Sequence, residues 1–373
     1  MSSLEKNTSE NLYLAALSSI TGLGPKRLQK LKQVLKTWQN IWESNTNIWQ
    51  QLKIPPKTQQ LWQKKRETFN FSLLETSLEN NQITLIDQQH PNYPIALMDL
   101  ESPPLLLYAQ GTWPKSKKQI TIIGSRQPSP YGEEALKMIA IPLIKAGYST
   151  VSGLALGLDS LAHRLSLKYG GHTTAIIGSG LNNIYPRENK NLAQDIIKQG
   201  GLILSEYYLN APPIKANFIL RNRLLAAISP STLLVEANLK SGSMITARHT
   251  QKLKRKLYAV PGNIFNQQAA GCHQLIQNGA ILCNQASEIL GVNSMETNIQ
   301  AENYLNLEPV ALSIIKLLKK QRSSFSELSA DQISALLKLD TVSTNSTLSI
   351  LEMKKYITQR QGRYSINSKT TEY

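Results

Sequence analysis

The stretch ITIIGSRQPSPYGEEALKMIA, residues 120–140, decides the fold class. Its β-branched start predicts a strand, the Gly, Ser and Pro residues that follow predict a short loop, and apolar residues at helical spacing predict a helix over 131–146. The N–H groups that begin a helix stabilise an anion. The dinucleotide motif G-x-G-x-x-G, with an acidic residue about 20 positions later, is absent, and Arg126 stands in the loop. The stretch therefore predicts a phosphate site of another kind.

The same alternation of strand and helix continues for five more units. The strands lack polar alternation, which indicates a parallel sheet covered by helices on both faces. We therefore predict an α/β fold with a Rossmann-like core. The expected strands are YSTVSG (148–153), TTAIIGSG (173–180), LILSE (202–206), TLLVEA (232–237) and KLYAVPG (256–262), each followed by a helix, at 157–169, 189–199, 217–228, 243–254 and 272–278.

The region before this core is helical in pattern from Leu12 to about Leu78. Within it, SITGLGPKRLQKL (19–31) resembles a helix-hairpin-helix, a SAM-like unit, with two glycines between helix-forming runs. Such a hairpin contacts nucleic acid or serves as a structural or protein-contacting unit, and the low regional charge favours the second role. Residues 90–111 carry four prolines and predict a packed connector that ends in a strand at 105–109.

The region after the core begins with GVNSMETNIQAENY, which has linker composition. Three expected helices, near 310–318, 331–337 and 342–353, and a hairpin around Gly362 predict a winged helix. The third of these helices has no Lys or Arg, so we expect an accessory or protein-contacting role rather than duplex recognition. The predicted domains are residues 1–82, 83–290 with the connector, a linker at 291–304, and 305–373.

The composition favours a polyanion partner for the central domain. The 373 residues carry a net charge of +16, of which +2 falls in residues 1–110, +3 in 111–119, +9 in 120–290 and +2 in 291–373. No apolar run is long enough for a membrane span and the polar start resembles no secretory signal, so we expect a cytoplasmic protein without membrane contact. Two cysteines without a CxxC motif predict buried or idle thiols.

The carboxyl ends of the expected parallel strands are rich in Gly and Ser. A ligand of a parallel sheet lies outside these ends, and several backbone cradles side by side suit repeating phosphates better than one nucleotide. The alternative is that these loops are merely glycine-rich turns. The candidate residues of this kind are Gly124, Ser125, Ser152, Gly153, Gly157, Gly178, Gly180, Ser241, Gly242 and Ser243.

An insertion before one helix, PPIKANFILRNRLLAA (212–227), adds an aromatic residue and cations. Phe218 and Arg221 share one helix face, and an exposed aromatic residue among cations stacks a base and screens its backbone. Phe218 could instead belong to the core. At least one of Arg221 and Arg223 is expected to pair internally, with Glu206 as the obvious partner.

No catalytic site, metal site or cofactor is predicted. A hydrolytic set of Ser152, Asp159 and His163 can be drawn, but a helix-start Asp with a structural His one turn later is the simpler interpretation. The sequence has no HExxH motif, no Walker lysine and no paired carboxylates at metal-ligand spacing.

In combination, these motifs resemble the DprA (Smf) family of DNA-processing proteins over nearly the whole chain. The motifs that carry the resemblance are YPIALMDLESPPLLLYAQG (93–111), IIGSR (122–126), SGLALGLDSLAH (152–163), GSGLNNIYPREN (178–189), LSEY (204–207), PIKANFILRNR (213–223), VEANLKSGSMITAR (235–248), AVPG (259–262) and GCHQLIQNGA (271–280).

The resemblance implies a Rossmann-like core that binds single-stranded DNA, forms a homodimer and loads RecA onto the strand during natural transformation. Single-stranded-DNA-binding protein is a further expected partner. Two positions depart from the family pattern: His273 replaces an Asn, and Ser102 replaces an Asp. The binding pocket that the resemblance implies uses Gly124, Ser125, Arg126, Ser152, Gly153, Gly157, Lys215, Phe218, Arg221 and Arg223, with Lys254 as a further backbone contact.

The alternative class is a Rossmann-fold phosphoribohydrolase-like enzyme that cleaves nucleoside monophosphates. Such enzymes carry a PGGxGT-type loop followed by a catalytic Glu. Here SGSMITAR follows Glu236 and no acid comes after it. We therefore expect a binding protein rather than an enzyme.

Overall fold

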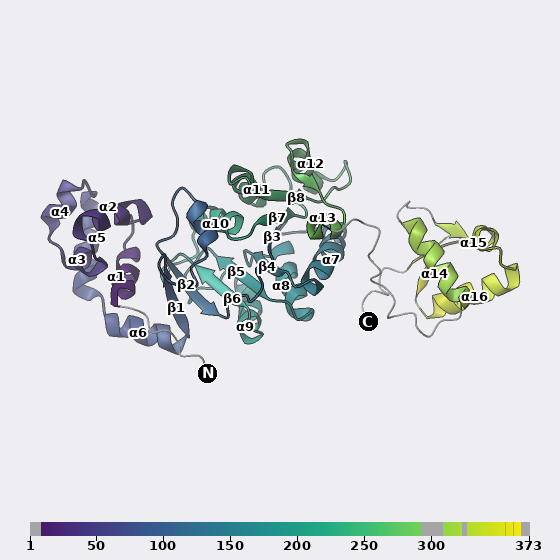
Figure 1. Cartoon of the computed structure of the whole chain (residues 1–373), viewed down its shortest axis with the longest axis horizontal. Coiled ribbons are helices and arrows are strands. Elements are labelled where there is room, and N and C mark those ends of the chain that lie inside the picture. Colours follow the sequence, from purple (N-terminus) through teal and green to yellow (C-terminus); the bar gives the residue numbers. More distant parts are fainter. Residues whose placement is uncertain (1–8, 292–308, 323–326, 355, 361, 367–373) are drawn as a thin grey trace. The chain divides into compact units, whose positions relative to one another are not determined.

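Figure 1 shows the computed structural model of the chain, in which strands and helices alternate through the central region. The structure describes residues 9–291, 309–322, 327–354, 356–360 and 362–366. By its internal contacts the chain divides into two compact units, residues 1–293 and 294–373.

The first unit is built on a sheet that has nine strands in the described part of the chain, in the order β1-β2-β6-β5-β4-β3-β7-β8-β9. From β6 to β9 the neighbouring strands are parallel, whereas β2 is antiparallel to both β1 and β6. The predicted parallel core is confirmed, and the antiparallel edge is a feature that the sequence analysis did not predict. The strands are β1 (Ile83–Asp87), β2 (Leu106–Gly111), β3 (Gln119–Ile123), β4 (Ser149–Ser152), β5 (Thr173–Ile177), β6 (Leu202–Ser205), β7 (Ser231–Leu234), β8 (Lys256–Ala259) and β9 (Ile281–Leu282).

Helices cover both faces of this sheet. One apolar cluster joins α7 and α8 to one face, and a second cluster joins α10, α11 and α12 to the other. Residues of β4, β5, β6 and β7 are all buried, as expected for strands covered on both sides. These helices are α7 (Pro130–Lys145), α8 (Leu158–Lys168), α9 (Lys190–Lys198), α10 (Lys215–Ile228), α11 (Ser243–Lys252), α12 (Ala270–Gln277) and α13 (Ser287–Leu290), with short 3-10 turns η1 (Ile95–Asp99), η2 (Arg187–Asn189) and η3 (Gln267–Ala269).

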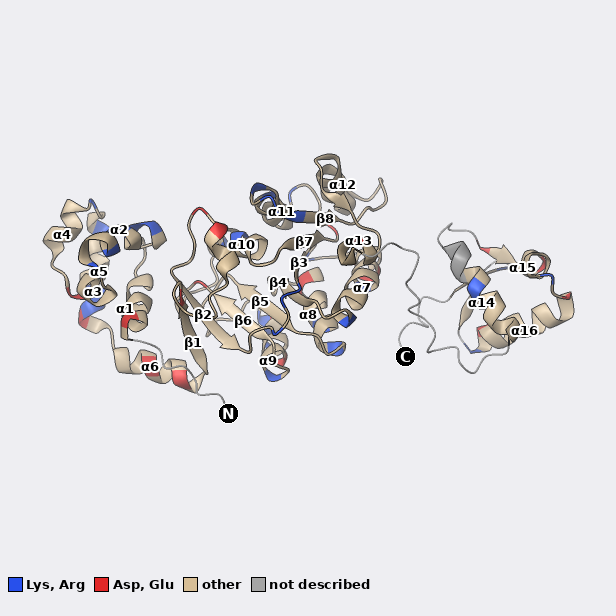
Figure 2. Ribbon diagram, in the orientation of Figure 1, with Lys and Arg blue, Asp and Glu red and all other residues tan. Residues whose placement is uncertain are grey.

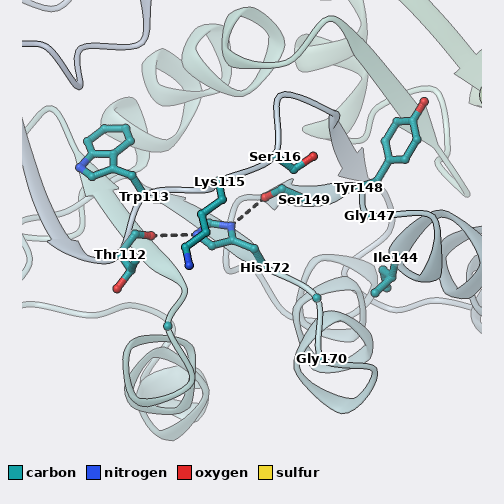
Figure 3. A pocket seen from close by; sticks show the side chains of 12 residues that line it. Thr112, Trp113, Lys115, Ser116, Ile144, Gly147, Tyr148, Ser149, Gly170 and His172 are labelled. Atoms are coloured by element: carbon teal, nitrogen blue, oxygen red, sulfur yellow. Dashed lines mark hydrogen bonds between the residues drawn. The ribbon is translucent and has the colours of Figure 1, made fainter.

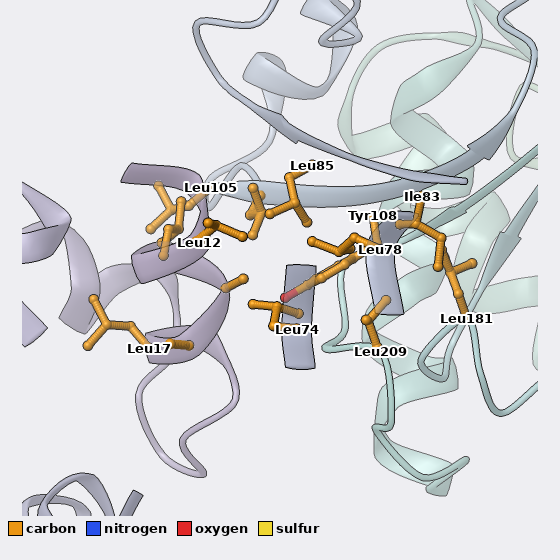
Figure 4. Packing of buried hydrophobic residues seen from close by; sticks show 14 of the residues in the cluster. Leu12, Leu17, Leu74, Leu78, Ile83, Leu85, Leu105, Tyr108, Leu181 and Leu209 are labelled. Atoms are coloured by element: carbon orange, nitrogen blue, oxygen red, sulfur yellow. The ribbon is translucent and has the colours of Figure 1, made fainter. Parts of the chain in front are cut away.

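The amino-terminal helices pack on the β1 and β2 edge. Leu12, Leu74 and Leu78 lie in one cluster with Leu85 and Tyr108 of the sheet (Figure 4). The helical region and the sheet therefore share a core within the first unit. The helices are α1 (Ser9–Ser18), α2 (Pro25–Leu35), α3 (Trp38–Glu43), α4 (Thr46–Gln51), α5 (Pro56–Thr68) and α6 (Phe71–Asn80).

The second unit contains three helices and a three-stranded antiparallel sheet among its described residues, with the strand order β10-β12-β11. Its core includes Ile314, Ile333 and Leu348, one from each helix. Apart from Gly291, the predicted linker 291–304 lies outside the described residues. The elements are α14 (Pro309–Arg322), β10 (Leu328–Ser329), α15 (Ala330–Leu337), α16 (Thr341–Met353), β11 (Ile357–Arg360) and β12 (Arg363–Ile366).

No helix in the described ranges combines the length and apolar character needed to cross a membrane.

Candidate nucleic-acid interface

The loops after β3, β4, β5, β6 and β7 leave the same end of the parallel sheet, because these strands are neighbours with one direction. We call the edge that these loops form the carboxyl rim. It is where a parallel α/β sheet binds its ligands. Most predicted site residues lie in these loops or at the starts of α10 and α11. The exceptions are Ser152, the last residue of β4, Arg221 and Arg223 in the middle of α10, and Lys254.

The first two loops of the rim are in direct contact. The Leu158 N–H donates to the carbonyl oxygen of Ser125 at 3.1 Å. Gly157 has a φ of +77°, and a Cβ there would lie 2.4 Å from the same Ser125 oxygen. Only glycine allows this approach. The contact fixes the Gly124–Arg126 turn and leaves the Arg126 side chain exposed.

The Arg221 side chain lies inside the rim, where it joins the loop after β4 to strand β5. It is 4% exposed and donates to the carbonyl oxygens of Gly153, at 2.8 Å, and Ile176. A Cβ on Gly153 would lie 2.7 Å from the guanidinium, so this glycine makes room for the arginine. Burial lowers the pKa of Arg221 to about 10, and Arg126 nearby adds to the decrease. The predicted direct contact of Arg221 with DNA is therefore not available in this structure.

Asp159 is the buried carboxylate beside this arginine. Its Oδ2 accepts the Gly153 N–H at 3.0 Å. Burial raises the pKa of Asp159, whereas the Arg221 charge and the hydrogen bonds lower it. Asp159 and Arg221 thus interact electrostatically, and each also holds the loop after β4 through a hydrogen bond to the Gly153 backbone.

Ser152 is also internal, which corrects its place among the predicted DNA contacts. It is 0% exposed, and its hydroxyl donates to the Ile122 carbonyl oxygen at 2.7 Å. The His163 ring, equally buried, contacts Thr173 through Nδ1, and burial lowers its pKa to about 3. The Ser152 hydroxyl also lowers the pKa of Asp159 through a hydrogen bond, but His163 contacts Thr173 instead of either residue, so the hydrolytic set that could be drawn from the sequence is not assembled.

Arg223 pairs with Glu206, as predicted for one of the two arginines. The atoms Nη2 and Oε1 are 2.5 Å apart, and the two side chains are only 17% and 12% exposed. Burial raises the pKa of Glu206, and the charge of Arg223 opposes that rise. A direct phosphate contact of Arg223 would require breaking this pair, so its position supports a structural role.

Phe218 forms an aromatic surface at the start of α10. Its half-buried ring packs over Gly178, where a Cβ would lie 2.8 Å from the ring atom Cδ1. The ring centroid of Tyr185 is 5.5 Å away, and Tyr185 is 45% exposed. The exposed Lys215 begins the same helix. We call Phe218 and Tyr185 the aromatic platform.

The sequence analysis did not identify Tyr185 and Arg187, and it assigned phosphate contacts to two glycines, Gly178 and Gly180, that are buried. Tyr185 and the exposed Arg187 lie in YPREN, directly after the glycine loop, and that position is the signal that could have identified them. Gly178 and Gly180 are buried: the first makes room for Phe218, and a Cβ on the second would meet the Leu209 carbonyl at 2.1 Å. These two glycines shape the rim and do not present an open cradle.

The loop after β7 ends at α11. Ser241 Oγ and Ser243 Oγ are 2.7 Å apart, and Gly242 between them is exposed. The helix begins without a side-chain cap. These three residues remain an accessible part of the rim.

Lys254 lies at the other end of the sheet. It follows the last turn of α11 and precedes β8, whose first residue is Lys256. A ten-residue helix is about 15 Å long, so Lys254 is separated from the rim by the length of α11. Lys254 therefore lies apart from Gly124, Ser125 and Arg126, and its predicted contact with the DNA backbone stays a prediction.

A protein carboxylate occupies the start of α7, where the sequence suggested a phosphate. The Ser129 N–H and hydroxyl donate to Glu236 at 2.8 and 2.6 Å, and Ser129 caps the helix. Glu236 is 2% exposed and also accepts from Asn266 at 3.3 Å. The anion site at the helix dipole is thus filled internally, and the exposed anion-binding group of this loop is Arg126.

At the opposite end of the parallel strands, where their amino ends lie, the structure contains a cavity of about 300 Å³ (Figure 3). Its lining includes Trp113, Lys115, Tyr148 and His172. His172 is fixed there, with Nδ1 2.7 Å from Ser149 Oγ and Nε2 2.8 Å from the Thr112 carbonyl oxygen. We call this cavity the amino-edge pocket, and none of the predicted site residues lines it.

One departure from the family pattern has a defined contact. His273 Nε2 lies 3.1 Å from the carbonyl oxygen of Gly262.

In the described part of the chain, no group of three or more His, Cys, Asp or Glu residues could hold a metal ion.

Together these features define a Rossmann-like α/β protein whose Gly- and Ser-rich loops line one end of a mostly parallel sheet. Residues 84–293, more than half of the chain, match the family model described as DNA recombination-mediator protein A. The chain belongs to this family, the DprA or Smf family that its motifs resemble.

Individual relatives agree with this assignment. The chain is 34% identical to the protein Smf of Synechocystis over 289 residues, which are 76% of this chain and 72% of that protein. It is similar to the crystal structure of DNA processing protein A from Streptococcus pneumoniae, with a TM-score of 0.65, 28% identity and coverage of 78% of this chain and 100% of the other. A structure of DNA processing protein A from Helicobacter pylori, described by its single-stranded DNA binding mode, has a TM-score of 0.51, 34% identity and coverage of 56% and 94%.

Proposed function

We propose that this chain binds single-stranded DNA along the carboxyl rim and loads RecA onto it during natural transformation. The observation that carries the proposal is the aromatic platform among exposed cations. Phe218 and Tyr185 offer ring faces for bases, while Arg126 and Lys215 offer positive charge for the backbone. Stacking on aromatic rings beside cations is the way in which proteins hold single strands without reading their sequence.

The position of the buried Arg221 supports a DNA-binding role for the exposed Arg126. Arg126 is close enough to Arg221 to affect its pKa, and Arg221 lies one helical turn from Phe218. Arg126 and the aromatic platform therefore belong to one neighbourhood. The Helicobacter pylori relative, whose structure is described for its single-stranded DNA binding, gives this proposal independent support.

We propose a binding protein rather than the phosphoribohydrolase-like alternative. The glutamate that follows β7 is Glu236, and its carboxylate oxygens already accept from Ser129 and Asn266 inside the protein. A general acid or base needs access to substrate. At 2% exposure, Glu236 lacks that access.

Self-association is part of the proposal, and the edge of the sheet supports it. The last strand, β9, exposes Ile281 and Leu282 at 42% and 44%, and Ile264 and Phe265 in the loop after β8 are exposed at 79% and 89%. An exposed apolar edge strand is a template for pairing with another chain. We propose that a second copy covers this edge. RecA and single-stranded-DNA-binding protein are the further partners proposed, in the cytoplasm.

The terminal regions are proposed to be accessory. We interpret the α14–α16 unit as a winged helix and residues 19–31 as a helix-hairpin-helix. The α16 sequence TVSTNSTLSILEM has no Lys or Arg, which supports a protein-contacting role.

The test of the central proposal is a binding comparison on the full chain. Fluorescence anisotropy would measure its affinity for a labelled oligothymidylate, a duplex of equal length and a labelled nucleoside monophosphate. We expect binding of the single strand, with weak binding of the duplex and of the monophosphate. Displacement of the single strand by duplex at equal nucleotide concentration would refute the rim as a single-strand site.

The RecA step needs its own assay. RecA ATPase activity on a strand coated with single-stranded-DNA-binding protein should start earlier when this chain is added. An unchanged lag, with strand binding intact, would remove RecA loading from the proposal and leave DNA binding.

A further inference from the structure

Residues 237–287 contain six Lys or Arg residues and no Asp or Glu. One of the six, Arg255, is engaged inside the protein: it pairs with Asp99 at 2.9 Å and donates to the Ser229 carbonyl oxygen at 2.7 Å. The other five are exposed. We call them the α11 stripe: Lys240, Arg248, Lys252, Lys254 and Lys256.

The α11 stripe runs from one end of the sheet to the other. Lys240 lies in the loop of the carboxyl rim, two residues before the exposed Gly242. Arg248 and Lys252 are four residues apart, so they share one face of α11, opposite the buried Ala247 and Thr250. Lys254 and Lys256 follow at the amino ends of the strands. Figure 2 shows the blue Lys and Arg positions on α11.

Internal electrostatics do not account for the stripe. Among the described residues, none of its five side chains forms an ion pair with a carboxylate. Glu101 is within electrostatic range of Lys252, but its carboxylate is bound by Lys26 at 2.8 Å. Compensation of the helix dipole would explain a cation in the last turn, such as Lys252, but not Lys240, Arg248 or Lys256.

We propose that the α11 stripe extends the DNA site, guiding a single strand from the carboxyl rim along the outer face of α11. This inference rests on the proposed function and adds to it the course that the strand follows beyond the rim. Like-charged side chains that lie about one helical turn apart repel one another unless an anion lies between them. A strand with repeating phosphates matches such a row of cations, whereas a single nucleotide contacts one or two of them.

If the strand follows α11, the affinity of the chain for single-stranded DNA increases with strand length. An oligothymidylate of about six nucleotides is long enough for the rim, and one of about twenty is long enough to follow α11 as well. The full chain should bind the longer strand more tightly, with a steeper dependence of log K on log salt concentration, because more counterions are released.

The test variant is Arg248→Gln/Lys252→Gln/Lys254→Gln in the full chain. For the long strand we expect affinity to fall at least about fivefold at low salt, and the salt slope to become shallower by about 2, which is three phosphates at roughly 0.7 each. For the short strand we expect the wild-type affinity. Circular dichroism and thermal melting check that the variant is folded.

The matched control removes three exposed lysines from helices of the opposite face: Lys145→Gln/Lys168→Gln/Lys198→Gln, at the ends of α7, α8 and α9. It carries the same change in net charge. We expect it to bind the long strand within about twofold of wild type, since long-range charge effects are screened by salt. Equal losses in the two triple variants would show a general charge effect and overturn the path.

The outcomes separate this inference from the proposed function. A wild-type chain that binds neither strand would refute the rim itself. A chain that binds both strands, with the stripe variant unchanged on the long one or equally weakened on both, would overturn the α11 path and leave the rim in place.

Discussion

The carboxyl rim and the amino-edge pocket lie at opposite ends of the same parallel strands, and they hold their polar groups differently. At the rim, the buried Arg221 and Asp159 support loops whose outer residues, such as Arg126, are exposed. At the pocket, His172 bonds to Ser149 and Thr112, and Lys115 is the cation in the lining.

The difference bears on which end of the sheet suits the proposed DNA strand. The pocket is lined by Gly147, Gly170 and Gly200, which follow the carboxyl ends of α7, α8 and α9. Carbonyl groups at such helix ends carry partial negative charge and disfavour a phosphate. The rim combines ring faces and exposed cations, which a flexible strand can use.

The largest effect is expected for the internal support of the rim. Arg221→Met removes the donor that satisfies the buried Gly153 and Ile176 carbonyl oxygens, and each buried group left without a partner costs about 1–3 kcal/mol of the free energy of unfolding. Denaturant unfolding monitored by circular dichroism measures this loss at pH 8. Wild-type stability in this variant would show that Arg221 is not the support described here.

The same variant should show a characteristic pH dependence. Burial already raises the pKa of Asp159 and Arg221 lowers it, so removing Arg221 raises that pKa further. The folded variant then takes up a proton that the unfolded chain binds less tightly, and this uptake favours the folded state as pH falls. The stability deficit against wild type should therefore be smaller at pH 5 than at pH 8. A deficit that grows on acidification would contradict the electrostatic interaction between these two residues.

The next effect concerns the aromatic platform. Phe218→Ala should weaken single-strand binding by roughly 1–3 kcal/mol and leave the salt slope nearly unchanged, because stacking releases no counterion. Tyr185→Ala is the companion variant and should weaken binding in the same way. Anisotropy titrations at several salt concentrations measure both quantities, after thermal melting has shown that Phe218→Ala is folded. A shallower salt slope would mean that the ring acts through neighbouring charges.

A smaller effect is expected for the exposed cation of the rim. Arg126→Ala should weaken binding and make the slope of log K against log salt concentration shallower by about 0.7, the value for one single-strand phosphate. Arg223→Met serves as a contrast, because its guanidinium is held by Glu206. If Arg126→Ala changes affinity without changing the slope, the assignment of a phosphate to Arg126 is wrong.

The smallest effect belongs to the pocket. Lys115→Gln should leave single-strand affinity within about twofold of wild type, because one exposed lysine distant from the strand contributes little through screened charge. A loss comparable to that of Arg126→Ala would remove the distinction between the two ends of the sheet.

Local sequence patterns were sufficient for the alternation of strands and helices in the core. The six predicted helices begin and end within a few residues of α7 to α12, because apolar spacing, Gly and Pro act locally. The antiparallel β2 was harder to predict, since the connector predicts a strand there but not its direction. Direction depends on pairing with β6, almost a hundred residues away.

The roles of the site residues were less predictable, because burial and partners depend on distant parts of the chain. Arg221 looks like any helix-surface cation until the carbonyls of Gly153 and Ile176 are placed against it. Lys254 follows the loop of Ser241 to Ser243 in the sequence. Helix α11 lies between that loop and Lys254, so Lys254 is at the other end of the sheet. Arg223 was the exception, because a nearby carboxylate in the loop layer was visible in the sequence.

The internal position of Glu236 has a consequence for competition among ligands. A helix start left vacant at a Rossmann-like sheet attracts the phosphate groups of any free nucleotide, and such small anions are abundant in cells. Here the chain supplies its own anion, through Ser129 at the start of α7. A mononucleotide meets no vacant helix dipole at that position, while a polymer still gains from many weak contacts at once. Under the proposed function, selectivity for strand length over chemical identity follows from a helix start that is already filled.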